Sequence, residues 1–204
     1  DTVGFSSLKL AGVAASSAIV TLGVNGVTDQ LVTGSTSAAG GIEVVNFVVG
    51  AAGDAIDLDL SGIEGIGTND LLLIDDSTTN VAAATTVVID EVTGAFNADT
   101  LATGTVILNV SGNFATAGML ITALEVGGSH AWTTDGAVAA ADSFLVSWDD
   151  GTNSYLSAIA SANIILDNGT AVVGGLTETT LITFTGIADA STLLAANFGT
   201  TIVA

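Results

Sequence analysis

Short segments with alternating apolar and polar residues recur along the chain. This period of two, in segments rich in Val, Thr and Ile, is typical of β-strands with one buried face. The clearest segments are Val3 to Leu10, Ile42 to Val49, Ala55 to Leu60, Thr105 to Val110, Ser143 to Trp148 and Leu181 to Phe184. The pattern predicts a mainly β fold, a β-sandwich or β-roll-like domain built from many short strands.

Asx-Gly pairs separate several of these segments and favour tight turns, because Asn, Asp and Gly tolerate positive φ angles. The pairs are Asn25-Gly26, Asp135-Gly136, Asp150-Gly151 and Asn168-Gly169. Two of them predict hairpins. One joins Phe144 to Trp148 with Tyr155 to Ile159, and the other joins Ala162 to Leu166 with Thr170 to Val173.

Three short segments fit helices better than strands. They are Asn97 to Leu101, Phe114 to Glu125, and a segment that begins at Asp189 or Ser191 and continues to Phe198. Gly127-Gly128 provides a stop for the second, and Asp189 or Ser191 an N-cap for the third. Neither a linker nor a repeat of fixed period divides the chain. We expect a single domain over residues 1–204, with a subdivision near residues 95–113 as the alternative.

The charge of the chain is strongly one-sided. It has 21 Asp and Glu against one basic side chain, Lys9, and a formal net charge of -20, although 49% of its residues are hydrophobic. Such a surface repels nucleic acid and anionic membranes and attracts cations. The apolar runs are too short for the ~20 residues of a membrane span. The first residues do not resemble a secretory signal, so we expect either prior processing or export by another route.

The residues needed for common types of catalysis are scarce. The chain has no Cys, and His130 is its only His, so thiol chemistry is excluded and a catalytic triad would depend on one residue. We predict no enzymatic activity, and no catalytic or cofactor-binding residues. The position of His130 beside Trp132 favours a packing or surface role.

Clustered carboxylates are the candidate metal ligands. Asp54, Asp57 and Asp59 lie in and beside one predicted strand, and Asp149-Asp150 lies in a predicted turn. In a strand, Asp57 and Asp59 share a face, and such oxygen-rich sites suit Ca²⁺. We therefore predict Ca²⁺ as the ion. The alternative interpretation is that these are solvated strand faces and turn residues.

Aromatic residues offer a second candidate site. Trp132, Trp148 and Tyr155 are the residues that would form a glycan-binding face, since the predicted hairpin brings Trp148 close to Tyr155. The alternative is that they pack in the core or across the hairpin.

Three segments resemble a family of secreted bacterial proteins. GIEVVNFVVGAAGDAIDLDLSGI at 41–63 is similar to the phrase that follows the calcium repeats of RTX-type proteins. FLVSWDDGTNSYL at 144–156 resembles the hairpin after it, and ITFTGIADASTLLAANF at 182–198 resembles the C-terminal ends of surface-layer proteins and adhesins exported by type I secretion. The calcium nonapeptide itself is missing, so none of the family's calcium ligands transfers to a residue here. The resemblance implies a β-rich, extracellular protein exported without an N-terminal signal.

These observations support two classes of function. The first is a non-enzymatic structural protein of the cell surface that assembles with copies of itself into a surface layer, sheath or filament, aided by Ca²⁺. The second is a carbohydrate-binding or cap domain of a larger adhesin or hydrolase that recognises surface glycans. A third interpretation is a protein of a salt-rich cytoplasm, which explains only the acid excess. For self-assembly, residues Thr2 to Leu10 offer a strand for completing a neighbour's sheet.

Overall fold

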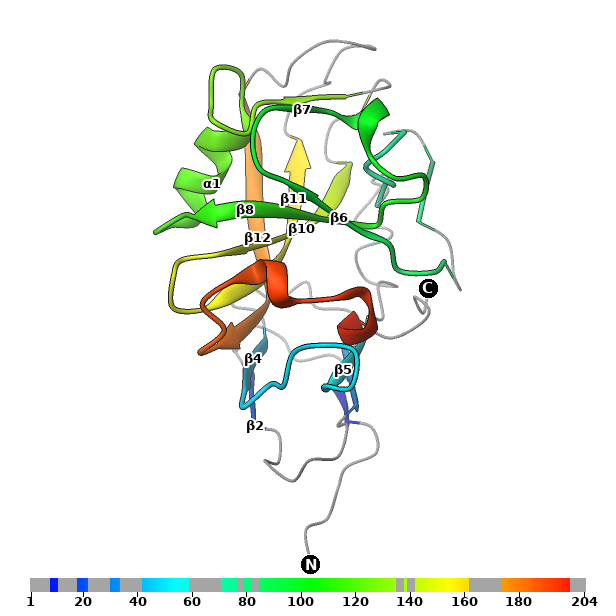
Figure 1. Ribbon diagram of the computed structural model, residues 1–204, viewed down its shortest axis with the longest axis vertical. Helices are drawn as coiled ribbons and strands as arrows, with labels where there is room; N and C mark the ends of the chain where they lie inside the picture. Colours follow the sequence, from blue (N-terminus) through cyan, green and yellow to red (C-terminus); the bar gives the residue numbers. More distant parts are fainter. Residues whose placement is uncertain are drawn as a thin grey trace, which may run out of the picture.

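A computed structural model shows a mainly β protein, as predicted (Figure 1). It describes residues 8–10, 18–21, 30–33, 42–58, 71–76, 79–81, 85–134, 138, 142–161 and 174–198. The strands of these segments form one large sheet and two smaller ones.

The large sheet contains seven strands in the order β2-β4-β12-β11-β10-β8-β6. Their bounds are Ala18–Thr21 for β2, Ile42–Val45 for β4, Ile89–Val92 for β6, Ile107–Asn113 for β8, Ser143–Asp149 for β10, Ser154–Ser161 for β11 and Leu176–Thr185 for β12. Only the two pairs that include β11 are antiparallel. Six of the seven strands therefore run in the same direction.

The first five strands alternate between two sheets. β1 (Leu8–Leu10), β3 (Gln30–Thr33) and β5 (Ala55–Leu58) form a parallel sheet, while β2 and β4 pair in parallel in the large one. Parallel neighbours cannot be joined by a tight turn, and here the connection between them is a strand of the opposite sheet. The sequence predicts a β-sandwich or a β-roll-like domain, and this alternation of strands between two sheets is closer to the second of these arrangements.

The same alternation recurs later in the chain. β6, β8 and β10 lie in the large sheet, and the strands between them, β7 (Phe96–Asn97) and β9 (Trp132–Thr133), pair in parallel as a small sheet. The one α-helix of the described segments, α1 (Ala117–Leu124), lies between β8 and β9 in the chain.

The large sheet is covered on both faces, so it separates two hydrophobic cores. On one face, Val44, Leu156 and Phe184 pack with Ile56 of β5 and with Phe198. The core on the other face contains Val110 and Val146 of the sheet, Leu120 and Leu124 of α1, and Trp132 of β9. Every residue of the central strand β10 is buried, which is the pattern of a strand with covering layers on both sides.

The hairpin predicted around Asp150-Gly151 is confirmed. β10 and β11 pair from Ser143 and Ala160 to Asp149 and Ser154, and Gly151 has φ 81° in the turn. The hairpin predicted at 162–173 lies outside the described residues.

The predicted helical segments form one α-helix and three short 3₁₀ turns. Thr116 is the N-cap of α1, with its Oγ1 atom 3.3 Å from the backbone nitrogen of Met119. The 3₁₀ turns are η1 (Ala98–Thr100), η2 (Ala190–Thr192) and η3 (Ala195–Phe198), and Asp189 is the N-cap of η2. Each of these three segments has only three or four residues and forms a single 3₁₀ turn instead of an α-helix.

The N-terminal strand segment is used within its own chain, because β1 pairs with β3. The part of the predicted arm before Leu8 lies outside the described residues.

One buried side chain joins the C-terminal segment to the loop between β4 and β5. Asn197 is fully buried, and its Oδ1 accepts hydrogen bonds from the backbone nitrogens of Gly50 and Leu194, both at 3.0 Å. Its Nδ2 donates to the carbonyl oxygens of Gly50, at 3.2 Å, and Asp54, at 2.8 Å. The oxygen and the nitrogen of this one amide therefore connect Asn197 to Gly50 and Asp54, which precede it by 147 and 143 residues.

We expect Asn197→Ala to lower the free energy of unfolding by about 2–4 kcal/mol, because it leaves several buried backbone groups without partners. Urea unfolding followed by circular dichroism measures this loss. Asn80→Ala, at an exposed position, is the control and should change stability by less than about 0.5 kcal/mol. Equal effects of the two substitutions would contradict this role of Asn197.

Candidate functional site

The turn between β10 and β11 holds two adjacent carboxylates, Asp149 and Asp150, that the sequence proposes as metal ligands. Asp149 is 7% exposed, and its carboxylate accepts hydrogen bonds from the backbone nitrogens of Gly151 at 3.0 Å and Ala190 at 3.2 Å. Asp150 accepts from the backbone nitrogens of Thr152 and Asn153 at 2.8 and 2.7 Å. Both carboxylates therefore organise the turn.

The same turn shifts the pKa values of the two carboxylates in opposite directions. Burial raises the pKa of Asp149, and its two backbone hydrogen bonds offset only part of that rise. Burial acts in the same direction on Asp150, but hydrogen bonds from Tyr155, Asn153 and Thr152 outweigh it, so the pKa of Asp150 is lowered. The phenol of Tyr155 donates to Oδ2 of Asp150 at 2.6 Å. Burial and this hydrogen bond raise the pKa of Tyr155 itself.

The other three proposed ligands belong to the segment around β5. Asp54 is 2% exposed, and its Oδ2 accepts a hydrogen bond from the backbone nitrogen of Val48 at 2.8 Å. Asp57 lies in β5, where it pairs with Val32, and Asp59 lies outside the described residues. Within the segments that the structure describes, no three acidic or histidine side chains gather in an arrangement that would hold a metal ion. The Ca²⁺ site therefore stays a prediction.

A row of buried polar side chains lies under η2, on the face of the large sheet that packs against β5. Nδ2 of Asn109 donates to the carbonyl oxygen of Ala190 at 2.7 Å, and Oγ of Ser154 donates to that of Ile187 at 2.8 Å. Together with the contact of Asp149, these hydrogen bonds hold the segment 187–190 on the sheet. The sequence shows Asn109 only as an isolated Asn-Val-Ser motif, so its structural role was missed.

Two atoms of this polar row have no hydrogen-bond partner. They are Oδ1 of Asn109 and Oγ of Ser147, both on buried residues, and the two residues are neighbours in the pairing of β8 with β10. These two atoms are therefore the polar groups of the row that the protein's own donors and acceptors leave unsatisfied.

A cleft of about 220 Å³ opens beside this row, along the edge strand β6. It is lined by Ile89, Glu91, Asn109, Ser191, Leu193, Leu194 and Ala195. Its walls are mainly apolar, with the carboxylate of Glu91 as the one charged group of the lining. Leu194 is 44% exposed there. The cleft therefore combines apolar side chains with the polar groups of Asn109, Ser191 and Glu91, next to an acidic sheet edge.

The aromatic residues pack inside the protein. The rings of Trp148 and Tyr155 are stacked with centroids 4.3 Å apart, as the predicted hairpin requires. Trp148 is 3% exposed, and its Nε1 donates to Oγ of Ser157 at 2.9 Å. Trp132 is 1% exposed and lies edge-on to Phe144. The two indole rings proposed for glycan stacking are therefore not at the surface.

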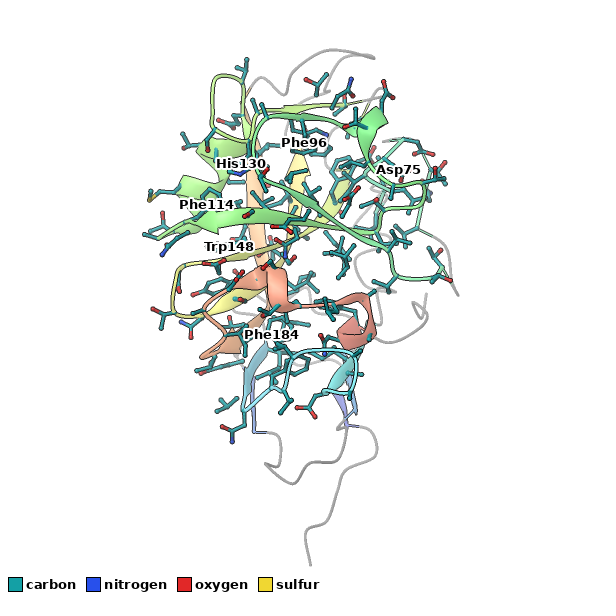
Figure 2. The ribbon with its side chains drawn as sticks, in the orientation of Figure 1. Asp75, Phe96, Phe114, His130, Trp148 and Phe184 are labelled. Carbon is teal, nitrogen blue, oxygen red and sulfur yellow. The ribbon has the colours of Figure 1, made fainter. Side chains whose placement is uncertain are left out.

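His130 is also buried, and Figure 2 shows it between α1 and β8, beside Phe114. The two rings meet edge to face with centroids 5.6 Å apart, and Nδ1 lies 3.0 Å from Oγ of Ser129. Burial lowers the pKa of His130, and the backbone of Ser111 offsets part of this effect. The position is that of a packing histidine.

Comparison of the chain with protein family models, with curated proteins and with solved structures found no match. The resemblance to RTX-type proteins therefore stays a prediction. Among the described segments, the structure contains no helix with the length and apolar character of a membrane span.

The opposite pKa shifts of Asp149 and Asp150 predict opposite pH effects on stability. The pKa of Asp149 is raised above its ordinary value of 3.8, so the stability that protonated Asp149 contributes is complete below pH 3.8 and is lost as the pH rises through the raised pKa. The pKa of Asp150 is lowered, so its contribution is complete above pH 3.8 and is lost as the pH falls through the lowered value.

The test compares wild type with Asp149→Asn and with Asp150→Asn, by urea unfolding at several pH values from about 3 to 8. The stability of wild type relative to Asp149→Asn should decrease with rising pH, and that relative to Asp150→Asn should increase. Each variant is the control for the other, since the residues are adjacent. The same pH dependence for both variants would show that the turn does not shift the pKa values of Asp149 and Asp150 in opposite directions.

Proposed function

We propose that this protein is a non-enzymatic, extracellular structural protein that assembles with copies of itself into a surface layer, sheath or filament, and that Ca²⁺ promotes the assembly. The observation that carries the proposal is the large open sheet, whose end strands β2 and β6 each have a hydrogen-bonded strand on one side only among the described segments. Open sheet edges are templates for pairing with another chain.

The charge of the chain accounts for the proposed role of the cation. Copies with a formal net charge of -20 repel one another when they come into contact, and bound or screening cations reduce that repulsion. Divalent Ca²⁺ suits the oxygen-rich surface, because it binds carboxylate and carbonyl oxygens without demanding a rigid geometry.

Two further observations agree with an extracellular structural role. The segments at 41–63, 144–156 and 182–198 resemble secreted bacterial surface proteins, which supports export by type I secretion and a place outside the cell. The indole rings and His130 are used in packing, so neither indole ring is available at the surface for stacking on a sugar. Such a surface favours association with copies of the chain over stacking on glycans.

We expect Ca²⁺ to lower the protein concentration at which assembly begins by about tenfold or more, equivalent to about 1.4 kcal/mol per contact. Size-exclusion chromatography with light scattering, together with negative-stain electron microscopy, measures assembly in Ca²⁺ and in EDTA. NaCl at the same ionic strength is the control for charge screening alone. A chain that stays monomeric with Ca²⁺, with NaCl and at high protein concentration would contradict self-assembly, and assembly that is the same in EDTA would contradict the role of Ca²⁺.

A further inference from the structure

The two edges of the large sheet have the same direction. β2, β4 and β12 are mutually parallel, and the antiparallel strand β11 separates them from β10, β8 and β6, which are parallel again. Two reversals of direction cancel, so β2 and β6 are parallel to each other. A second copy, related by a translation along the sheet combined with the rotation that the twist of the sheet requires, therefore presents β2 in the correct direction for parallel pairing with β6.

The two edges also occupy opposite ends of one lateral row of residues. The pairing runs from Ala18 of β2 through Ile42, Ile182, Leu156, Ser147 and Asn109 to Glu91 of β6. Laterally paired residues lie on the same face of a sheet. Ala18 and Glu91 are therefore on the same face, which is also the face of the cleft.

The two edge strands differ in charge. β6 has the sequence Ile-Asp-Glu-Val, and the carboxylate of Asp90 accepts hydrogen bonds from the backbone nitrogens of Glu91 and Ala102, at 2.9 and 2.8 Å. β2 has the sequence Ala-Ile-Val-Thr, without charge. Pairing of β6 with β2 therefore avoids the repulsion of acidic residues on both strands.

Pairing of two identical edges is less favourable. Two β6 strands related by a twofold axis pair in antiparallel fashion and place two Asp-Glu pairs opposite each other, and like charges at that distance are destabilising. Two paired β2 strands leave both β6 edges and both clefts uncovered. The pairing of β6 with β2 uses both edges of every copy with a single kind of contact.

The cleft provides space for the side chains of an added strand. A strand beside β6 directs alternate side chains to the face of Glu91, and the cleft there is lined by Ile89, Leu193 and the 44% exposed Leu194. In strand addition, main-chain hydrogen bonds supply affinity and such side-chain pockets supply specificity. Ala18 and Val20, the residues of β2 on this face, are apolar, and four of the seven residues that line the cleft of about 220 Å³ are apolar as well.

We propose that the edge strand β2 of one copy adds in parallel to β6 of the next copy, so that the large sheet continues from subunit to subunit in a head-to-tail filament. The proposal rests on the self-assembly proposed above and names the surfaces that carry it. Head-to-tail contacts that do not close into a ring generate open filaments.

Disulfide trapping tests this contact directly, because the chain has no Cys of its own. Glu91→Cys is mixed, under assembly conditions and mild oxidation, with single variants at the four positions of β2. Neighbouring strands bring paired Cα atoms within the range of about 4.4–6.8 Å that a disulfide needs. Ala18→Cys and Val20→Cys share the face of residue 91, so we expect them to form roughly tenfold more mixed disulfide than Ile19→Cys and Thr21→Cys. Thr179→Cys, at an exposed position of the interior strand β12, replaces Glu91→Cys in the control mixture and should give none.

A second pair of variants tests the edge without a crosslink. The backbone N–H of Glu91 donates to the carboxylate of Asp90, and an added strand must take the place of this acceptor. Glu91→Pro removes the N–H group and should prevent assembly, since proline is tolerated on an edge strand but blocks addition of another. Circular dichroism and thermal unfolding verify that it stays folded. Glu91→Gln keeps the N–H group and removes one charge, so we expect it to assemble at a lower Ca²⁺ concentration than wild type.

The possible outcomes separate this inference from the proposed function. Mixed disulfides on the expected face and a folded, monomeric Glu91→Pro variant support it. Two results overturn the β6–β2 contact and leave self-assembly intact. The first is filaments in which Glu91→Cys forms disulfides mainly with a second Glu91→Cys chain. The second is filaments in which Glu91→Cys forms no mixed disulfide with the β2 variants and Glu91→Pro assembles like wild type. A chain that forms neither assemblies nor crosslinks overturns both. If Glu91→Pro unfolds, the crosslinking pattern alone decides.

Discussion

The parallel direction of most strands in the large sheet is the constraint on which the rest of the structure depends. A chain that makes two neighbouring parallel strands must travel back between them, and it cannot do so in a tight turn. In this protein the returning segments are themselves secondary structure. β1, β3 and β5 return along one face, while β7, α1 and β9 return along the other. Each connection thus also covers a face of the sheet, so the covering layers and the connections are the same residues.

This constraint explains the distribution of hydrophobic residues. β10 and β8 lie between two covering layers, so Leu145 and Val146 are both buried although they point to opposite faces. Strands of this kind lose the strict alternation that marks a half-buried strand. The burial of both faces of these strands therefore accounts for part of the 49% of hydrophobic residues in this strongly anionic chain.

Local sequence features were sufficient to predict the local structure. The Asp150-Gly151 turn, the alternation on either side of it and the Gly pair after α1 depend on residues that are close in sequence, and the predicted hairpin and helix are present. The parallel order of β6, β8 and β10 depends on pairing between distant segments, for which short strands give no register signal. The cleft beside β6 was missed for the same reason, because β6, β8 and the segment 191–195 that form it are distant in sequence.

The candidate ligands show a similar limit. The sequence identifies acidic clusters, but it does not distinguish a carboxylate that faces a cation from one that binds backbone N–H groups. Asp54, Asp149 and Asp150 all accept such hydrogen bonds, each in a turn or loop. In a chain without proline, carboxylates of this kind fix turn geometry, and part of the acid excess has that local purpose.

The hydrogen bonds of Asn197 have a consequence for the order of folding. They connect the loop after β4 to the 3₁₀ turn η3, across almost three quarters of the chain. Phe198 belongs to the same core as Val44 and Ile56, so this core cannot be completed before residue 198 has been synthesised. Contacts so distant in sequence form slowly, because a long loop must close first. During synthesis the core around Val44 and Ile56 therefore stays incompletely packed until Asn197 and Phe198 are available to cover it.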